Sequence, residues 1–483
     1  LTSKAEMSFS FKRILWCLSA VGWIAIASQT EAAKPNFLVL LLDDAGWTDV
    51  ACFGSQIQTP NIDGLADEGM KFTDCHSAAP NCSPSRAGLL TGRTPSRVGI
   101  YSYLPAGHVM HLRDDEVTVA ELLQANGYRT GHFGKWHLSR LESDQPQPSD
   151  QGFDYSLGTD NNASPSHRNP NNFVRNGQAV GEIEGYSCQI VVDETIQWLE
   201  ESGTDSEDPF FACVWFHEPH TPIASPPELV EKYQRRFPDL TKKQATYFAN
   251  IHNVDEAIGR LLAKVDQMGI SQDTVIFFTS DNGPLNAFSS VGLRGKKSNV
   301  WEGGHRVPGI FRWPGKIEAG SECAAPVCGV DYLPTVCEIA GIETPQDREL
   351  DGVSLLPLLK GDADELKREK PLYWFFYRLN PSLAIRDGNW SLIANTNDAT
   401  RPKTHALIAK DMPAIRASEP VAFQLYDLSA DLNQRNDVAG THPEVLQRLQ
   451  ERSRSMHREV MTDGVEWAIP ESYGAGKVSK IWE

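Results

Sequence analysis

Residues 35–44 have the sequence PNFLVLLLDD, and this stretch indicates the class of fold. The apolar run shows no alternation with polar side chains, so it predicts a strand buried on both faces, as in a parallel sheet. The run ends in two adjacent carboxylates, Asp43 and Asp44. Ligands of open α/β sheets bind beyond the carboxyl ends of the strands. Adjacent acids repel each other unless a cation compensates them, so the pattern favours a metal site over a solvated turn.

A second apolar run, TVIFFT at 274–279, also ends in polar oxygen ligands, because Ser280 is followed by Asp281 and Asn282. Two such strands in one parallel sheet would bring Asp43, Asp44, Asp281 and Asn282 to one point. All four side chains offer hard oxygen atoms, and the set includes no thiolate or imidazole. The sequence therefore favours Ca²⁺ or Mg²⁺ over Zn²⁺ at this point.

Two further predicted strands end in basic side chains. Residues 128–137, YRTGHFGKWH, place Lys135 and His137 two apart, so in extended backbone they point to the same side. A cation and an imidazole aimed together suit an oxyanion and its leaving group, although both could be ordinary surface residues. The buried strand at 209–216, PFFACVWF, is followed by His217 and His220, for which capping or core roles are the alternative.

Residues 81–92, NCSPSRAGLLTG, predict a loop that turns into a helix. Pro84 suits the first helical position and Ser83 can cap the helix just ahead of it. Cys82 would then lie at the helix N-terminus, where free N–H groups and the macrodipole favour a bound anion, with Arg86 one turn further on. A buried structural cysteine is the other interpretation of this stretch.

The pattern Cys-x-Pro-Ser-Arg followed by Leu-Thr-Gly resembles the signature of the type I sulfatases. In that family a separate maturation enzyme oxidises the cysteine to Cα-formylglycine. The segment Gly-Lys-Trp-His-Leu at 134–138, the histidines near prolines at 217–222 and the segment at 293–308 look like further sulfatase patterns. The resemblance covers nearly the whole chain from Pro35 onward.

The resemblance implies an alkaline-phosphatase-like α/β sandwich with a mainly parallel central sheet flanked by helices. It also implies Ca²⁺ as the metal, with Mg²⁺ possible, and a ligand set of Asp43, Asp44, Asp281 and Asn282 completed by an oxygen on modified Cys82. The overall pattern looks closest to arylsulfatases and N-acetylgalactosamine-6-sulfatases.

By the same resemblance, the hydrated side chain made from Cys82 attacks sulfur, oriented by the metal and Arg86, and a covalent sulfate ester forms. His137 then removes the proton that allows sulfate to leave. Lys135, His220 and Lys297 hold sulfate oxygens or protonate the leaving alcohol. His220 is preferred to His217 because Pro219 directly precedes it. Counting back five residues from Glu302 favours Lys297 over its neighbour Lys296.

Length and charge set the broad limits on function. The 483 residues suggest two or more domains, and the net charge of −18 argues against nucleic acid or an acidic membrane surface as a partner. A local cluster of cations and a metal must therefore attract any anionic substrate.

The first 33 residues resemble a signal peptide, because Lys12 and Arg13 precede an apolar run at 14–27 and then small residues. Met7 is the expected initiator, and residues 1–6 are expected to be spurious. An uncleaved membrane anchor is the alternative. We expect a secreted or periplasmic protein, or a lysosomal-type compartment in a eukaryote, without stable membrane insertion.

Domain organisation follows from composition. We predict a catalytic domain at 34–365 and a smaller C-terminal subdomain at 366–483, with a short-stranded antiparallel sheet and a terminal helix at 444–460. Residues 145–176 predict a long surface loop beside the substrate subsite. Cys323 and Cys328 are close enough in sequence to pair, with Cys337 a further candidate. Candidate sugar contacts are His108, His111, Arg113, His167 and Arg168.

The resulting hypothesis is hydrolysis of a sulfate monoester on a sulfated carbohydrate or aryl sulfate, with the formylglycine-generating enzyme as a maturation partner. A phosphodiesterase or phosphonate monoester hydrolase of the same superfamily is one alternative. An inactive glycan-binding relative is the other.

Overall fold

The computed structural model describes residues 34–141, 143–201, 208–285, 292–378, 382–397 and 407–473. The predicted signal segment, 1–33, lies outside these residues. The largest element is a ten-stranded mixed sheet in the order β11-β2-β10-β9-β1-β8-β4-β5-β6-β7. Its strands are β1 (Asn36–Leu42), β2 (Met70–Phe72), β4 (Arg129–Lys135), β5 (Tyr155–Thr159), β6 (Phe173–Arg175), β7 (Gln178–Gly181), β8 (Phe210–Trp215), β9 (Thr274–Ser280), β10 (Gly309–Arg312) and β11 (Ser321–Cys323).

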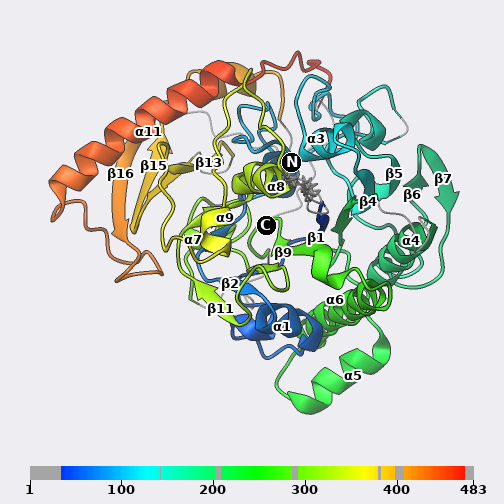
Figure 1. Ribbon diagram of the computed structural model, residues 1–483. Coiled ribbons are helices and arrows are strands. Elements are labelled where there is room, and N and C mark those ends of the chain that lie inside the picture. Colours follow the sequence, from blue (N-terminus) through cyan, green and yellow to red (C-terminus); the bar gives the residue numbers. More distant parts are fainter. Residues whose placement is uncertain are drawn as a thin grey trace, which may run out of the picture. The chain divides into compact units, whose positions relative to one another are not determined.

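The two faces of β1 explain its unbroken apolar sequence. Phe37, Val39 and Leu41 face a core shared with helices α2 (Cys82–Thr91), α3 (Val119–Ala125) and α8 (Tyr332–Ala340). The alternate residues Leu38 and Leu40 face a second core, formed with α1 (Pro60–Asp67), α4 (Ser187–Glu201) and α6 (Lys242–Gln267). The sheet therefore lies between two helical layers (Figure 1), as a strand buried on both faces requires.

Five central strands, in the order β9-β1-β8-β4-β5, run parallel to one another. Their carboxyl ends consequently meet along one edge of the sheet. The chain pairs β1 with β8 on one side and with β9 on the other, so the segments that follow these strands converge. Further elements outside this sheet include α5 (Pro227–Arg236), α7 (Glu302–His305), α9 (Leu356–Leu359), α10 (Asp411–Arg416) and the short pair β3 (Cys75–His76) and β12 (Val327–Cys328).

The C-terminal part forms a separate four-stranded antiparallel sheet in the order β13-β14-β15-β16. Its strands are β13 (Leu372–Phe376), β14 (Ser382–Asp387), β15 (Trp390–Thr396) and β16 (Pro420–Asp427), and α11 (Pro443–Asp463) packs against them. Figure 1 shows α11 lying along this sheet. The fold class predicted from the sequence is confirmed, whereas the domain boundary at 365/366 stays a prediction.

Two local predictions are wrong. The segment 145–176 is not one loop, because it contains β5, a strand paired with β4 in the main sheet. Helix α2 begins at Cys82 with Asn81 as its N-cap residue, and Ser83 does not cap it but accepts a hydrogen bond from the Leu104 backbone N–H.

Cysteine pairing is also absent where it was considered. Cys323 ends β11 and Cys328 ends β12, in different sheets, and both are free thiols. The cysteines of the described residues, from Cys52 to Cys337, are all free. Within the same part of the chain, no helix combines the length and apolar character needed to cross a membrane.

Candidate active site

The candidate residues follow four neighbouring parallel strands. Asp43 and Asp44 follow β1, Asp281 and Asn282 follow β9, Lys135 ends β4 with His137 just beyond it, and His217 and His220 follow β8. The backbone N–H of Asp43 donates to the Glu218 carbonyl oxygen at 2.9 Å, which ties the end of β1 to the end of β8.

The four predicted metal ligands lie together. The Asn282 side-chain N–H donates to Asp44 Oδ1 at 2.7 Å, and the Asp44 backbone N–H donates to Asp281 Oδ1 at 3.2 Å. Asp44 has a left-handed backbone, with φ of 69°, which only a few per cent of residues other than glycine adopt. Such strained residues concentrate at functional sites, and here the turn begins at the first residue after the buried strand end.

Three oxygen atoms of this acid cluster have no hydrogen-bond partner within the described residues. They are Asp43 Oδ1, Asp44 Oδ2 and Asn282 Oδ1, and all three are buried. Unpaired buried acceptors cost roughly 1–3 kcal/mol each, so a native site normally satisfies them. Carboxylate and amide oxygens are the ligands that Ca²⁺ and Mg²⁺ prefer, so the donor set fits a hard divalent cation.

Three cations face the three acids. Lys135 Nζ donates to Asp43 Oδ2 at 2.7 Å, and Lys297 Nζ donates to Asp44 Oδ1 at 2.5 Å. Arg86 donates from Nε and Nη2 to Asp281 Oδ2, at 3.0 and 2.8 Å. A divalent cation added to this balanced set leaves an excess of positive charge, which attracts an anion to an otherwise acidic protein.

The pKa values of the acids reflect both burial and these cations. Burial raises the pKa of Asp43, but the nearby charges of Lys135 and His220 outweigh it and hold that pKa well below its usual range. Burial and the charge of Asp43 raise the pKa of Asp281 to about 7, against the opposing effect of Arg86. Asp43 is therefore ionised at neutral pH, whereas Asp281 gives up its proton much less readily.

Cys82 opens helix α2 beside the acid cluster. Its Sγ lies within 4.8 Å of carboxylate oxygens of both Asp43 and Asp281. Burial raises the pKa of the Cys82 thiol, although the charges of Lys135 and Lys297 act in the opposite direction. An unmodified Cys82 is consequently a neutral thiol at neutral pH, whereas a cysteine nucleophile requires a lowered pKa.

The three candidate histidines differ in what they face. His220 Nε2 lies 3.6 Å from Asp44 Oδ2, and burial lowers the pKa of His220 to about 4. His137 forms a 2.9 Å hydrogen bond through Nε2 with the Leu104 carbonyl oxygen, which leaves its buried Nδ1 without a partner in the described chain. His217 is bonded through Nε2 to the Thr159 hydroxyl at 2.8 Å and packs against Phe173.

The two lysines at 296 and 297 are separated by the fold. Lys297 is buried and contacts Asp44, whereas Lys296 is exposed. The side chains proposed as sugar contacts are bonded within the protein: His108 to the Leu407 carbonyl oxygen, and His111 and Arg113 to residues two and three positions away in their own loop. His167 is buried beside Glu218.

Asn162 was missed by the sequence analysis. Its amide nitrogen lies 2.8 Å from His220 Nδ1, and its Oδ1 accepts from Lys135 Nζ at 3.4 Å. The residue follows β5 in the segment expected to be a loop, so no predicted strand end pointed to it. Asn162 thus links the side chains that follow β4 and β8.

Gly134 explains one fixed position of the Gly-Lys-Trp-His-Leu segment. It has φ of 103°, and a Cβ there would lie 1.9 Å from the carbonyl oxygen of Trp215 on the paired strand. Any side chain would force β4 away from β8 and displace Lys135 from Asp43.

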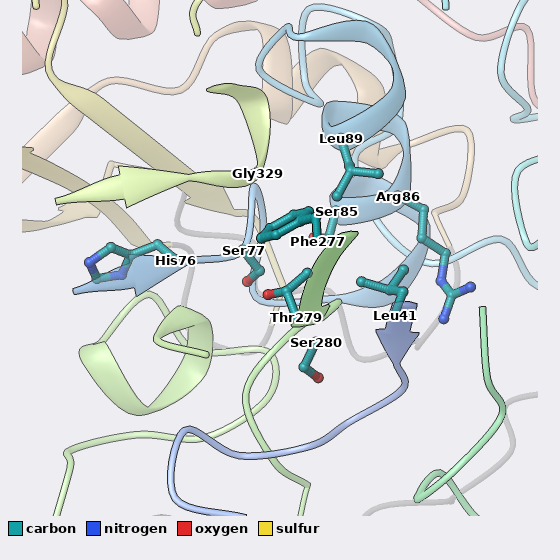
Figure 2. Close-up of a pocket in the computed structure, with 10 residues that line it drawn as sticks. All are labelled: Leu41, His76, Ser77, Ser85, Arg86, Leu89, Phe277, Thr279, Ser280 and Gly329. Atoms are coloured by element: carbon teal, nitrogen blue, oxygen red, sulfur yellow. The ribbon is translucent and has the colours of Figure 1, made fainter. Parts of the chain in front are cut away.

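A small cavity of about 10 Å³ lies beneath α2, with Arg86 and His76 at its opposite sides (Figure 2). Hydroxyl groups of Ser77, Ser85 and Ser280 contribute to its lining. The lining is nevertheless mainly apolar, with Leu41, Leu89 and Phe277 among its residues, and a space of this size could hold about one water molecule at most. The cavity is therefore too small for a substrate and is a packing space between α2 and the strands beneath it.

A second buried polar cluster contains His76, Glu302 and His305, whose possible ligand atoms lie within 4.8 Å of one another. Arg306 Nη1 lies 2.9 Å from Glu302 Oε2, and Arg386 on β14 bonds to Asp74 Oδ2 at 2.7 Å. These arginines compensate the acids, and Arg386 links β14 of the C-terminal sheet to α7 and to the segment just before β3.

Comparison with known proteins agrees with this arrangement. The family model described as Sulfatase matches residues 35–342, and the model described as N-sulphoglucosamine sulphohydrolase, C-terminal, matches residues 295–459. The strand ends, the acid cluster and the helix headed by Cys82 all fall within the first match, and this chain belongs to the sulfatase family. It is a sulfuric ester hydrolase.

Individual relatives cover most of the chain. Arylsulfatase G of Rattus norvegicus is 32% identical over 387 residues, which are 70% of this chain and 71% of the relative. N-acetylgalactosamine-6-sulfatase of Canis lupus familiaris is 32% identical over 409 residues, 78% and 74% of the two chains. The crystal structure of Ps i-CgsB in complex with k-i-k-neocarrahexaose is 26% identical, with a TM-score of 0.77, and covers 91% of this chain and 96% of that one.

Proposed function

We propose that this sulfatase uses a formylglycine made from Cys82 together with one divalent cation, Ca²⁺ in preference to Mg²⁺. Asp43, Asp44, Asp281 and Asn282 would hold the cation. The observation that carries the proposal is the set of three buried oxygens, on Asp43, Asp44 and Asn282, that have no hydrogen-bond partner in the described residues. They belong to the acid cluster whose Asp43 and Asp281 lie within 4.8 Å of Cys82 Sγ. When bound, the cation would supply Lewis acidity and fix the position of the reacting group.

The raised pKa of the Cys82 thiol supports modification of that residue. A neutral, buried thiol is a weak nucleophile, and the same position at the start of α2 suits a group that carries oxygen. The formylglycine would supply a hydrated aldehyde as the nucleophile. Arg86 positions Asp281 through two hydrogen bonds and donates a third, at 2.5 Å, to the Lys135 carbonyl oxygen, so it orders the base of the site.

Lys135, Lys297 and His220 surround the position that a sulfate group would take. Both lysine ammonium groups point at the acid cluster, and His220 Nε2 faces Asp44. In the proposed reaction they stabilise charge on the sulfate oxygens or protonate the leaving alcohol. His217 is the secondary candidate, and its bond to Thr159 directs Nε2 away from this role.

His137 is suited to accept a proton. Its Nε2–H donates to the Leu104 carbonyl, which leaves Nδ1 as the basic nitrogen. Burial, together with the charges of Lys135 and Arg86, holds the pKa of His137 well below its usual value. The imidazole is therefore neutral at neutral pH and able to remove the proton that releases sulfate.

The proposed substrate is a sulfated carbohydrate or an aryl sulfate. Relatives that are named arylsulfatase G and N-acetylgalactosamine-6-sulfatase support this choice. We further propose secretion or a periplasmic or lysosomal-type location, and maturation by a formylglycine-generating enzyme before folding is complete. The catalytic machinery would then lie within residues 34–365.

The test compares Cys82→Ala with Cys337→Ala, which alters a buried cysteine in α8, after co-expression with a formylglycine-generating enzyme. Sulfate release from 4-nitrophenyl sulfate should fall to background in Cys82→Ala and persist in Cys337→Ala. Hydrolysis of bis(4-nitrophenyl) phosphate is measured in parallel. A wild-type preference for the phosphodiester, or full sulfate release by Cys82→Ala, would overturn the proposal.

A further inference from the structure

The buried cluster of His76, Glu302 and His305 takes no part in the proposed reaction. His76 ends β3, and the other two residues begin and end α7. Their exposed fractions are 1%, 1% and 2%, and one possible ligand atom from each lies within 4.8 Å of the others. In Figure 2, His76 lies on the far side of the small cavity from Arg86, which bonds to Asp281 in the acid cluster. The two clusters are therefore separate.

The hydrogen bonds of the two imidazoles fix which nitrogen of each ring carries a proton. His76 Nε2 lies 2.7 Å from Asp74 Oδ1, and His305 Nε2 lies 3.1 Å from the Val300 carbonyl oxygen. Burial raises the pKa of Asp74, but the charge of Arg306 and the hydrogen bond from His76 outweigh it and hold that pKa well below its usual range. An ionised carboxylate and a carbonyl oxygen only accept hydrogen bonds. Both rings therefore donate through Nε2–H, and Nδ1 of each ring keeps a lone pair.

These two lone pairs face each other, because Nδ1 of His76 lies 3.0 Å from Nδ1 of His305. Two buried acceptors at this distance repel each other unless a cation lies between them. Burial lowers the pKa of His305 to about 3, so this ring does not take up a second proton at neutral pH. The remaining cations are a proton that His76 shares and a metal ion.

Three features favour the metal ion. The outer N–H of each ring is held by a carboxylate or a backbone carbonyl, which is how proteins orient histidines that bind metals. Glu302 places a carboxylate oxygen within 4.8 Å of both rings' ligand atoms, which a shared proton would not require. Two nitrogen ligands of a tetrahedral ion lie about 3.3 Å apart, so a small widening of the gap would admit one.

The donor set and the nearby charges indicate the kind of ion. Two imidazoles and one carboxylate suit Zn²⁺, whereas Ca²⁺ takes roughly six to eight oxygen ligands. The small cavity that His76 lines has room for about one water molecule, which would complete a tetrahedral set. Arg306 and Arg386 already offset the acids, so a divalent ion adds positive charge to a buried cluster, and we expect weaker binding than at thiolate sites.

We propose that His76, Glu302 and His305 form a second metal site, which binds a transition-metal ion of the Zn²⁺ class and has a structural role. The inference goes beyond the proposed function and does not depend on it. The ion would join α7 to β3. Trp374 of β13 stacks on the His305 ring, with centroids 4.0 Å apart, so the ion would also stiffen the contact with the C-terminal sheet. Lys297 shortly precedes α7, so its segment would be steadied as well.

The test is calorimetric titration of Zn²⁺ into chelator-treated protein, with Ca²⁺ kept in excess to fill the acid cluster. The wild-type protein should bind one Zn²⁺ ion per chain. Co²⁺ used in place of Zn²⁺ should give the visible absorption bands of a tetrahedral ion. The dissociation constant of Zn²⁺ should rise at least about a hundredfold in His76→Gln and in His305→Gln.

Two control variants locate the ion. His252→Gln changes a buried histidine on α6 that bonds to Tyr233, and Cys82→Ala changes a thiol that belongs to another group of possible ligands. Both should bind Zn²⁺ as the wild-type protein does. Loss of Zn²⁺ binding in Cys82→Ala alone would place the ion in the active site and overturn the proposal.

The wild-type measurements decide even if the histidine variants fail to fold. No Zn²⁺ uptake, or the spectrum of an octahedral Co²⁺ ion, would overturn the proposal, as would equal Zn²⁺ affinity in folded histidine variants. An imidazolium signal of His76 in ¹⁵N NMR, without Zn²⁺ uptake, would show that a proton joins the two rings instead. None of these results bears on sulfate release, so the sulfatase proposal stands or falls separately.

Discussion

Lys297 offers a sharp test of how the site holds an anion, because its neighbour Lys296 is a built-in control. Lys297 Nζ contacts Asp44 Oδ1 at 2.5 Å from a side chain that is only 7% exposed, whereas Lys296 is exposed. Burial lowers the pKa of Lys297, but the charge of Asp44 outweighs it and raises that pKa above its ordinary value, so the ammonium group stays charged. We predict that Lys297→Ala removes one of the charges that stabilise the transition state.

The expected magnitude follows from this geometry. Loss of one preorganised donor costs about 3–4 kcal/mol of transition-state stabilisation, which corresponds to roughly a hundredfold to a thousandfold in kcat/KM. Lys135 remains bonded to Asp43 and keeps part of the positive charge, so activity should not vanish. Lys297→Arg should recover part of the loss because it restores the charge.

The assay is kcat/KM on 4-nitrophenyl sulfate, with thermal unfolding by circular dichroism to establish that each variant is folded. Lys296→Ala should stay within about twofold of the wild-type protein, since its side chain lies outside the site. A folded Lys297→Ala protein whose kcat/KM is within about fivefold of wild type would refute the role assigned to this lysine.

Three other predictions concern stability. Removing Ca²⁺ with a chelator should lower the unfolding temperature, and restoring Ca²⁺ to 100 times its dissociation constant should return about 2.7 kcal/mol of unfolding free energy. An unfolding temperature that does not shift in scanning calorimetry would contradict a resident cation. Arg86→Met should cost about 3–5 kcal/mol in urea unfolding, because it leaves the buried Asp281 carboxylate unpaired, and a loss below about 1 kcal/mol would be inconsistent with this. Burial lowers the pKa of His457 to about 4, so as pH falls through 6.5 the unfolded chain gains a proton that the folded chain does not. The contribution of His457 to the free energy of unfolding is therefore present above its ordinary pKa, and it should decline by about 2 kcal/mol between about pH 7.5 and pH 5. Denaturant titrations at the two pH values should show that His457→Gln removes this decline.

The sequence was most informative where burial dictates residue type. An unbroken apolar run such as residues 37–42 is compatible with a strand between two helical layers, and the polar residues after it must lie at the sheet edge. That reasoning placed Asp43 and Asp281 at the ends of two strands of one parallel sheet, and the structure adds that these strands, β1 and β9, are direct neighbours. The choice between Lys296 and Lys297 needed the family pattern, because adjacent lysines carry no local signal.

The sequence was less informative where tertiary contacts decide. Strand β5 is short, with a half-polar sequence, and its pairing with β4 supplies what its own pattern does not. Helix α2 begins at Cys82, two residues before Pro84. Pro84 is tolerated inside the first turn because the backbone N–H that a proline lacks would have no intrahelical partner there. The two cysteines at 323 and 328 are near in sequence but end strands of different sheets.

Asn162 and the cavity beside His137 could not be foreseen for a related reason. An amide between two polar loops follows no periodic pattern, and its role depends on which side chains the sheet order brings near it. A cavity of about 90 Å³ beside His137 is lined by residues from three separate places in the chain, which only the folded structure brings together.

Mass spectrometry of the tryptic peptide of residues 72–86 tests the central claim most directly, using protein made with a formylglycine-generating enzyme and assayed for sulfate release from the same sample. The peptide should carry Cys82 with one sulfur and two hydrogens replaced by one oxygen, and the modified fraction should track specific activity across preparations. An active protein whose peptide contains only the unmodified cysteine would contradict the account.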